Sequence, residues 1–142
     1  VLEDVLLKSK EVPAAFFVSK EDLESKTGWR WQKSAKRIER KSRSGHDYVF
    51  TEGSMSFPDP IDRPSRTVIT GEGGKTPSRF KHIVEQDGKM RRLTPIELER
   101  LNMFPDDHTA LTGISDAKRA FFMGNALVVG VVERLGRGLL GM

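Results

Sequence analysis

Glycines, a lysine and a threonine gather at residues 71–76, which read Gly-Glu-Gly-Gly-Lys-Thr. A Gly-Lys-Thr ending is typical of phosphate-binding loops, whose backbone amides and lysine hold the phosphates of a nucleotide. That motif also requires a glycine at position 69, where Ile69 stands, and a following helix, which Pro77 disfavours. We therefore interpret the run as a flexible glycine turn whose backbone approaches another surface closely, and not as a nucleotide site.

The remaining residues with reactive or metal-binding side chains do not form a recognisable catalytic or metal-binding motif. The chain contains no cysteine, which excludes a thiolate nucleophile, a disulfide scaffold and a cysteine-ligated metal from this chain. His46, His82 and His108 lack the spacing of metal ligands, so we expect them at the surface or in turns. Scattered carboxylates offer no preferred acid–base pair. No catalytic residue and no metal site are predicted.

Positive charge is concentrated in two blocks. Residues 26–45 carry eight basic groups and one acidic group, and residues 63–92 carry eight basic groups and three acidic groups. Trp29, Trp31 and Tyr48 lie in or beside the first block. Basic residues interleaved with aromatics suit phosphate contacts combined with stacking. A solvated helical face is the alternative explanation of the same composition.

The length of 142 residues predicts one ordinary domain or two small ones. Hydrophobic residues make up 37% and charged residues 31%, enough for a core of its own. No apolar run approaches the roughly 18 residues that a membrane span needs. The start at Val1 shows neither an initiating methionine nor a signal peptide, so we expect a chain cut from something longer, working in the cytosol.

The elements predicted before residue 92 are short. Leu2 to Leu7 has a helical pattern, and Ser19 to Asp22 is typical of a helix start. β-branched and aromatic residues predict strands at 48–51, 66–70 and 80–84. Prolines and glycines between these segments predict loops.

The last third is helical in character. Thr94-Pro95-Ile96-Glu97 combines an N-cap, a proline at the first helical position and a capping-box glutamate. Ser115-Asp116 predicts a second helix start, running through Phe121. Apolar residues then recur at helical spacing between Leu127 and Leu135. Such a stripe usually packs against a sheet, and the preceding sequence contains no βαβ units to supply one.

Two sequence motifs follow one another in this last third of the chain. Residues 91–105 read R-R-L-T-P-I-E-L-E-R-L-N-M-F-P, and residues 124–132 read G-N-A-L-V-V-G-V-V. Together they resemble the last two motifs of the cytosine-5 DNA methyltransferases, R-x-L-T-x-x-E-x-x-R-L-x-x-F-P followed by G-N-[AS]-x-x-V. The resemblance is good over residues 60–135 and general over residues 1–59.

The resemblance implies an α+β fold. Residues 1–92 would form a small, β-rich target-recognition domain. Residues 93–142 would form C-terminal helices that complete a Rossmann-like methyltransferase domain largely absent from this chain. The missing sheet would then come from an N-terminal catalytic half or subunit, and the stripe from Leu127 to Leu135 would be an interface.

The resemblance also implies a reaction that this chain lacks the parts to perform. Members of the family flip a cytosine out of the duplex, attack it with a cysteine and transfer a methyl group from S-adenosylmethionine. The Pro-Cys nucleophile, the E-N-V motif and the glycine-rich cofactor loop are all absent from the sequence. We therefore expect activity only as part of a complete enzyme, with the nucleophile outside this chain.

Site residues follow from the matched motifs. Gly124, Asn125 and Ala126 resemble the turn that lines the pocket of S-adenosylmethionine. Arg91 and Arg92 are expected to organise the hinge between the two parts, and Glu97 to cap its helix.

Contacts to double-stranded DNA are expected on and beside the glycine turn, where Arg79 is the first choice for a base and Lys75 for a phosphate. The residues predicted to contact DNA are Arg66, Thr67, Thr70, Gly71, Glu72, Gly73, Gly74, Lys75, Ser78, Arg79 and Lys81.

Two other interpretations stay open at this point. The chain could be a stand-alone DNA-binding module without enzymatic activity, or a structural domain whose basic blocks are only solvated. We further expect no membrane partner, an association with the nucleoid through DNA, and self-association in isolation through exposed apolar surface.

Overall fold

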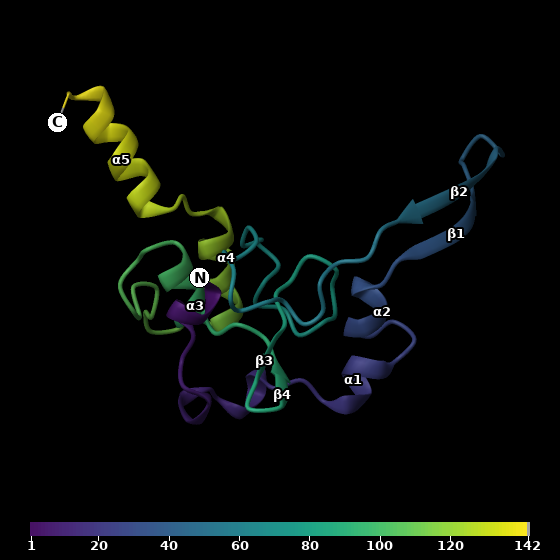
Figure 1. Ribbon diagram of the computed structural model, residues 1–142, viewed down its shortest axis with the longest axis horizontal. Coiled ribbons are helices and arrows are strands. Elements are labelled where there is room, and N and C mark those ends of the chain that lie inside the picture. Colours follow the sequence, from purple (N-terminus) through teal and green to yellow (C-terminus); the bar gives the residue numbers. More distant parts are fainter. Residues whose placement is uncertain (142) are drawn as a thin grey trace.

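The computed structural model describes residues 1–141, in which short elements alternate with long loops (Figure 1). It is a mixed α/β arrangement with two small antiparallel sheets, as the α+β prediction requires. In chain order the elements are the 3-10 helices η1 (Leu2–Val5), η2 (Ser9–Glu11) and η3 (Ala14–Phe16), then α1 (Lys20–Glu24), α2 (Trp29–Lys33), β1 (Lys36–Lys41), β2 (Asp47–Glu52), β3 (Val84–Gln86), β4 (Lys89–Arg91), α3 (Pro95–Leu101), α4 (Asp116–Asn125) and α5 (Val129–Leu139).

The predicted helix starts are confirmed because each depends on local hydrogen bonds. The Ser19 hydroxyl accepts from the backbone amide of Asp22 at 3.0 Å, and the Ser115 hydroxyl accepts from that of Lys118 at 3.3 Å. At α3 the capping box is complete, since the Glu97 carboxylate also accepts from the Thr94 amide at 2.7 Å.

Both sheets are hairpins of two strands. In β1–β2, Lys36 pairs with Glu52 and Lys41 with Asp47, so the predicted strand at 48–51 is confirmed. The turn between β3 and β4 is Asp87-Gly88, where both residues have positive φ. The strand predicted at 80–84 was wrong in extent, because the paired residues begin at Val84.

The strand predicted at 66–70 was wrong. Residues 64–69 form no regular structure, because no neighbouring strand pairs with them. The Arg66 side chain instead bonds to Asp59 and to the carbonyls of Phe80 and Lys81. This segment is an extended loop tied down by its arginine.

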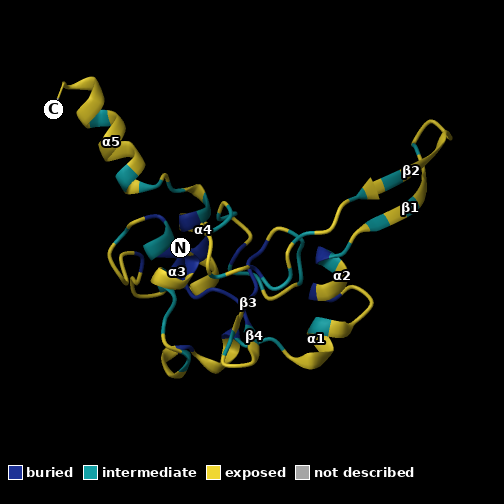
Figure 2. Ribbon diagram, in the orientation of Figure 1, coloured by how far each residue is buried: buried dark blue, intermediate teal, exposed yellow. Residues whose placement is uncertain are grey.

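The hydrophobic core lies between η1, β3, α3 and α4. It contains Leu2, Val84, Leu93, Leu98, Ala120 and Met123. Members come from both sides of residue 92, so the N-terminal segment and the C-terminal helices share one core. Buried segments accordingly gather around α3 and α4, while α5 and the β1–β2 hairpin are mostly exposed (Figure 2).

Helix α5 projects away from the rest of the chain (Figure 1). Its apolar residues are exposed: Val131 keeps 56% and Leu135 keeps 64% of its surface. Among residues 1–141, no other segment therefore packs over the predicted apolar stripe. No helix in that range is long and apolar enough to cross a membrane.

Candidate nucleic-acid interface and cofactor wall

The glycine turn wraps around the buried side chain of Lys81. Its ammonium group donates to the carbonyl oxygens of Gly74 at 3.0 Å and Thr76 at 2.8 Å. Burial lowers the pKa of Lys81, and the negative charge of Glu72 opposes that shift. Lys81 therefore shapes the loop from inside, and its charged end is taken up by the loop's own backbone.

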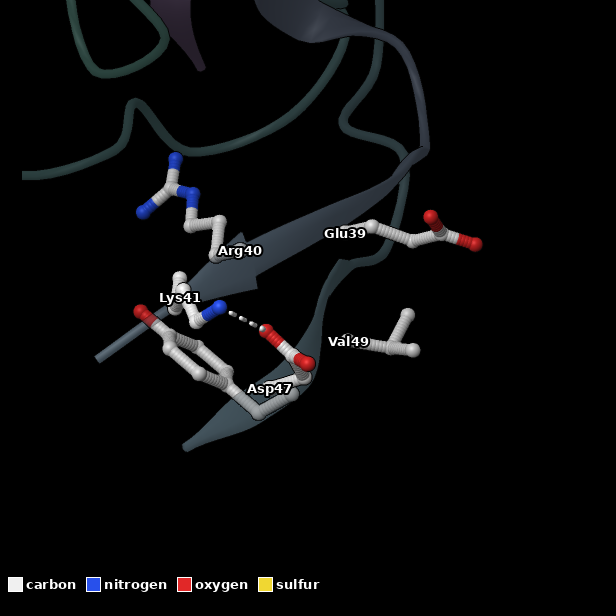
Figure 3. Close-up of a pocket in the computed structure, with 6 residues that line it drawn as sticks. Glu39, Arg40, Lys41, Asp47 and Val49 are labelled. Carbon is white, nitrogen blue, oxygen red and sulfur yellow. Dashed lines mark ion pairs between the residues drawn. The ribbon is translucent and has the colours of Figure 1, made fainter. Parts of the chain in front are cut away.

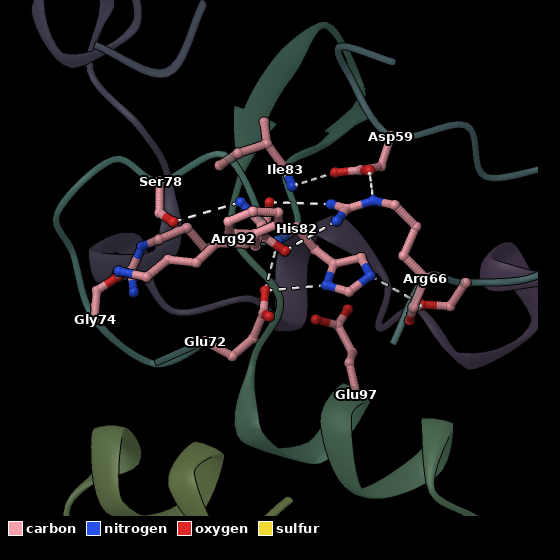
Figure 4. Close-up of polar contacts among 12 residues, drawn as sticks. Asp59, Arg66, Glu72, Gly74, Ser78, His82, Ile83, Arg92 and Glu97 are labelled. Carbon is pink, nitrogen blue, oxygen red and sulfur yellow. Dashed lines mark hydrogen bonds and ion pairs between the residues drawn. The ribbon is translucent and has the colours of Figure 1, made fainter. Parts of the chain in front are cut away.

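A second buried contact holds the loop to residue 82 (Figure 4). One oxygen of the Glu72 carboxylate accepts from the His82 backbone amide at 2.5 Å and lies 3.0 Å from its Nδ1. The other ring nitrogen of His82 lies 3.0 Å from the Ser65 hydroxyl. The expectation that His82 lies at the surface or in a turn was wrong, because this histidine links two loops inside the fold.

A third buried cluster joins helix α2 to the same loops. Asp59 contacts the Lys33 ammonium at 3.1 Å, the Arg66 guanidinium at 2.7 Å and the Ile83 amide at 2.8 Å. Burial alone would raise the pKa of Asp59, but these hydrogen bonds and charges outweigh it and hold the pKa below its ordinary value. Burial lowers the pKa of Lys33, against the attraction of Asp59.

Two of the glycines pack closely, and Gly73 is required because its neighbour is backbone, whereas the neighbour of Gly74 is the end of a lysine side chain. A Cβ at Gly73 would lie 2.7 Å from the Cα of Ala117 on α4, and one at Gly74 would lie 2.8 Å from the Lys81 ammonium. Neither residue has a positive φ. The turn expected to be flexible is thus pressed against α4 and against Lys81, while a Cβ at Gly71 would make only ordinary contacts of 3.8 Å with the Ile69 and Lys81 side chains.

Arg79, the predicted base contact, reaches the base of the β1–β2 hairpin. Its guanidinium donates to the carbonyl oxygens of Ser34, at 3.4 Å, and of Gly53, and it lies 3.3 Å from the Glu52 carboxylate. The side chain is mostly buried. Arg79 therefore fixes the position of the hairpin relative to the glycine turn.

The eleven residues predicted to contact DNA thus divide into two groups. Side chains of the first group are committed to contacts within the chain: Arg66, Glu72, Arg79 and Lys81. The exposed residues are Thr67, Thr70, Gly71 and Lys75, with Ser78, Gly73 and Gly74 half-buried between them. All of them lie on one loop system, and their contact with DNA stays a prediction.

The segment predicted to line a cofactor pocket lies at the end of α4. Gly124 and Asn125 form the last turn of this helix and Ala126 is its C-cap, and their contact with a cofactor stays a prediction. Gly124 and Ala126 line an open hollow of about 280 Å³, together with Ser65, Arg66, Thr67, Val68, Leu101, Asn102 and Met123. Asn125 is exposed, and its amide donates to the Phe121 carbonyl at 2.9 Å.

Gly124 is needed because helix α4 touches the neighbouring loop at this point. A Cβ there would lie 2.5 Å from the Cα of Thr70, and closer still to backbone atoms of Ile69 and Thr70. The backbone just before the glycine turn, at Ile69 and Thr70, therefore lies directly against the Gly-Asn motif, which brings the two predicted sites together.

The paired arginines before α3 are structural. Arg91 is fully buried and grips Glu97 through two hydrogen bonds of 3.0 and 2.7 Å. Arg92 donates to the carbonyls of Gly73 at 3.2 Å and Ala15 at 2.7 Å. These bonds tie the glycine turn and the N-terminal segment to α3. Glu97 caps its helix as predicted, and it also neutralises Arg91.

Sequence reasoning missed the buried charges Lys33 and Asp59, because residues 26 apart in the chain carry no local pairing signal. It also missed strand β1, since Lys-Arg-Ile-Glu-Arg-Lys shows no apolar alternation. Among residues 1–141, no group of histidine and carboxylate side chains could hold a metal ion.

Comparison with known proteins agrees with the two motifs. The family described as C-5 cytosine-specific DNA methylase matches residues 1–140. The Type II methyltransferase M.Sau3AI of Staphylococcus aureus is 44% identical over 108 residues, which cover 76% of this chain and 25% of that protein. The chain belongs to the C-5 cytosine-specific DNA methylase family.

Proposed function

We propose that this chain is the C-terminal part, or a subunit, of a DNA cytosine-5 methyltransferase. Residues 1–92 serve as the target-recognition region, and residues 93–142 complete a Rossmann-like catalytic domain supplied by an N-terminal half. The complete enzyme transfers a methyl group from S-adenosylmethionine to cytosine in double-stranded DNA, in the cytoplasm and at the nucleoid. The match to about a quarter of M.Sau3AI supports this division of labour.

The exposed apolar face of α5 carries the proposal. Val131 and Leu135 lie on one side of this helix, and the neighbouring Met103 is exposed as well. Met103, Gly130, Val131, Arg134 and Leu135 line an open apolar hollow of about 370 Å³. Exposed apolar surface of this kind marks an interaction site. A sheet from the catalytic half would cover it, and without that half the same face favours self-association.

The chain alone is predicted to be inactive. It has no cysteine to attack the C6 atom of cytosine, so the nucleophile must come from the catalytic half. The hollow beside Gly124 and Ala126 is open and lined partly by backbone, which suits one wall of a cofactor pocket. S-adenosylmethionine, when bound, supplies the methyl group. The exposed Asn125 side chain retains its carbonyl oxygen for a polar contact with that cofactor.

Recognition of DNA falls to the exposed part of the glycine turn. Thr67, Thr70, Gly71 and Lys75 are open to an approaching duplex, and Lys75 suits a phosphate oxygen. Side chains that already bond within the chain contribute to DNA binding indirectly, because Lys81 and Glu72 maintain the conformation of the turn. The rigidity of this loop lowers the entropy lost on binding.

Reconstitution tests the proposal. The chain is co-expressed with a catalytic half carrying the Pro-Cys motif, and transfer of tritiated methyl groups to duplex DNA is measured. We expect activity from the pair and none from either part alone. The double variant V131E/L135E should abolish the activity of the pair without changing the circular dichroism of the chain.

The outcomes separate the alternatives. Pairing without methyl transfer, under conditions in which an intact enzyme works, would contradict the enzyme proposal. Salt-dependent duplex binding by the chain in that case would identify a stand-alone DNA-binding module. Absence of any such binding would leave a structural domain.

A further inference from the structure

The β1–β2 hairpin stands apart from the rest of the fold. Its two strands pair only with each other within residues 1–141, and the hairpin extends outward beyond α2 (Figure 1). Most of its residues are exposed, including Tyr48 at 42% and Val49 at 44% (Figure 2). A two-stranded ribbon without a covering layer is marginally stable by itself. Such a projection is suited to contact with another molecule.

The base of the hairpin is firmly held. The Lys36 ammonium bonds to the Glu52 carboxylate at 2.9 Å and to the Gln32 carbonyl at 2.8 Å, and it lies 4.6 Å from the Trp31 ring centre. Arg79 reaches the same base from the glycine turn, through Glu52 at 3.3 Å. The hairpin is therefore presented at a fixed place beside the loop proposed to contact DNA.

The hairpin carries cations on both faces, from Arg37 near its base to Arg43 in its turn. Strand alternation places Arg40 on one face and Arg37 and Lys41 on the other, and Arg43 lies in the turn. Figure 3 shows Arg40 pointing away from the side on which Glu39 and Val49 lie. Of these four cations only Lys41 approaches a carboxylate, that of Asp47 at 3.8 Å, and both groups are exposed.

The Arg40 side chain is also pre-organised. Its guanidinium lies 4.1 Å from the centre of the Phe50 ring, which orients the planar cation without neutralising it. A shallow depression of about 540 Å³, lined by Glu39, Arg40, Lys41, Asp47, Tyr48 and Val49, runs along this end of the hairpin. The surface thus combines cations with apolar and hydrogen-bonding groups, and its carboxylates are Glu39 and Asp47.

We propose that the β1–β2 hairpin enters a groove of duplex DNA, with its cations on the phosphates of both flanking strands. The inference rests on the proposed function, because it assumes that this chain engages DNA. A two-stranded ribbon has the width that the major groove admits, and strands of six residues reach about 20 Å. A groove has a phosphate backbone on each side, which accounts for cations on both faces of the ribbon.

The test is the salt dependence of binding. The 142-residue chain is titrated with a 30-base-pair duplex of mixed sequence, and the logarithm of the association constant is plotted against that of the salt concentration. R37Q/R43Q removes two cations for which the structure shows no hydrogen bond or ion pair. Each lost phosphate contact lowers the slope by about 0.9, so we expect a fall of about 1.8 and, at 0.1 M salt, an affinity about 60-fold weaker.

A matched control removes the same charge elsewhere. K8Q/K10Q alters two exposed lysines of the N-terminal segment, which lies far from the hairpin (Figure 1). We expect its salt slope to stay within about 0.3 of the parent's. Because the chain has no cysteine, S44C in the hairpin turn provides a unique attachment point for an iron chelate. Cleavage of the bound duplex by this chelate is the second expected result.

The failures are distinguishable. A parent chain without salt-dependent binding would overturn the proposed recognition function and this inference with it. A normal parent slope that K75Q lowers and R37Q/R43Q leaves unchanged would overturn the hairpin proposal alone. Unchanged duplex binding with loss of methyl transfer in the reconstituted enzyme would assign the hairpin to a protein contact instead.

Discussion

Gly124→Ala tests the contact between helix α4 and the backbone of Ile69 and Thr70, just before the glycine turn. The added methyl group would lie 2.5 Å from the Cα of Thr70, against an ordinary carbon–carbon contact of about 3.5 Å or more. The obstacle is backbone, so no side-chain rotation relieves it. The helix and the loop must separate by about 1 Å, or the helix must end one turn earlier.

The expected cost exceeds the gain in helix propensity. Overpacking of this kind costs about 1–3 kcal/mol, while replacing glycine by alanine within a helix returns at most about 1 kcal/mol. We therefore expect the free energy of unfolding to fall by about 1–2 kcal/mol. Thr70 is one of the residues predicted to contact DNA, so displacement of this loop should also weaken the binding of duplex DNA.

Urea denaturation, followed by circular dichroism and by the tryptophan fluorescence of the buried Trp29 and the exposed Trp31, measures this loss. Gly136→Ala is the matched control, because the same substitution in α5 meets nothing within 4 Å. That control should increase helicity and leave the main transition in place. A Gly124→Ala chain with the urea midpoint of the parent would refute the argument that close packing selects this glycine.

Three further predictions concern charge and exposure. Glu97→Gln leaves the buried Arg91 without its carboxylate and should lower the free energy of unfolding by about 3–5 kcal/mol, measured in urea; a loss below about 1 kcal/mol would contradict it. The folded-state pKa of Asp59 lies below its unfolded value, so its stabilisation is present at neutral pH and disappears as the pH falls through and below the unfolded value of 3.8. Urea midpoints should accordingly drop between pH 5 and pH 3, and a constant midpoint would count against this. V131E/L135E should convert self-associated chain to monomer in light scattering, whereas an unchanged mass would place the association elsewhere.

Local signals explain the part of the fold that the sequence predicts. The three helix starts at Ser19, Thr94 and Ser115 each depend on hydrogen bonds within four residues, and all three are present. The Asp87-Gly88 turn is equally local, since both residues tolerate positive φ. The two family motifs likewise identify the chain from contiguous residues.

Nonlocal contacts explain the failures. Residues 66–70 have the composition of a strand, but Arg66 finds its partners at positions 59, 80 and 81, and no strand pairs with the segment. Strand β1 is stabilised by contacts with Phe50 and Glu52 of its partner strand. No residue pattern within β1 itself predicts these contacts. Residue type and closeness to the glycine turn predict the DNA-contact residues, and neither property distinguishes side chains that support the loop from those that face solvent.

The predominance of ionic contacts in the interior has a calorimetric consequence. Among the described residues ten hydrophobic and twelve polar or charged side chains are buried. Hydration of apolar surface raises the heat capacity on unfolding, and hydration of polar surface lowers it. The heat-capacity increment of this chain should therefore lie below the roughly 12 cal/mol/K per residue that is usual for globular proteins. Its stability curve is correspondingly less curved, so the unfolding enthalpy of this chain varies less with temperature than is usual.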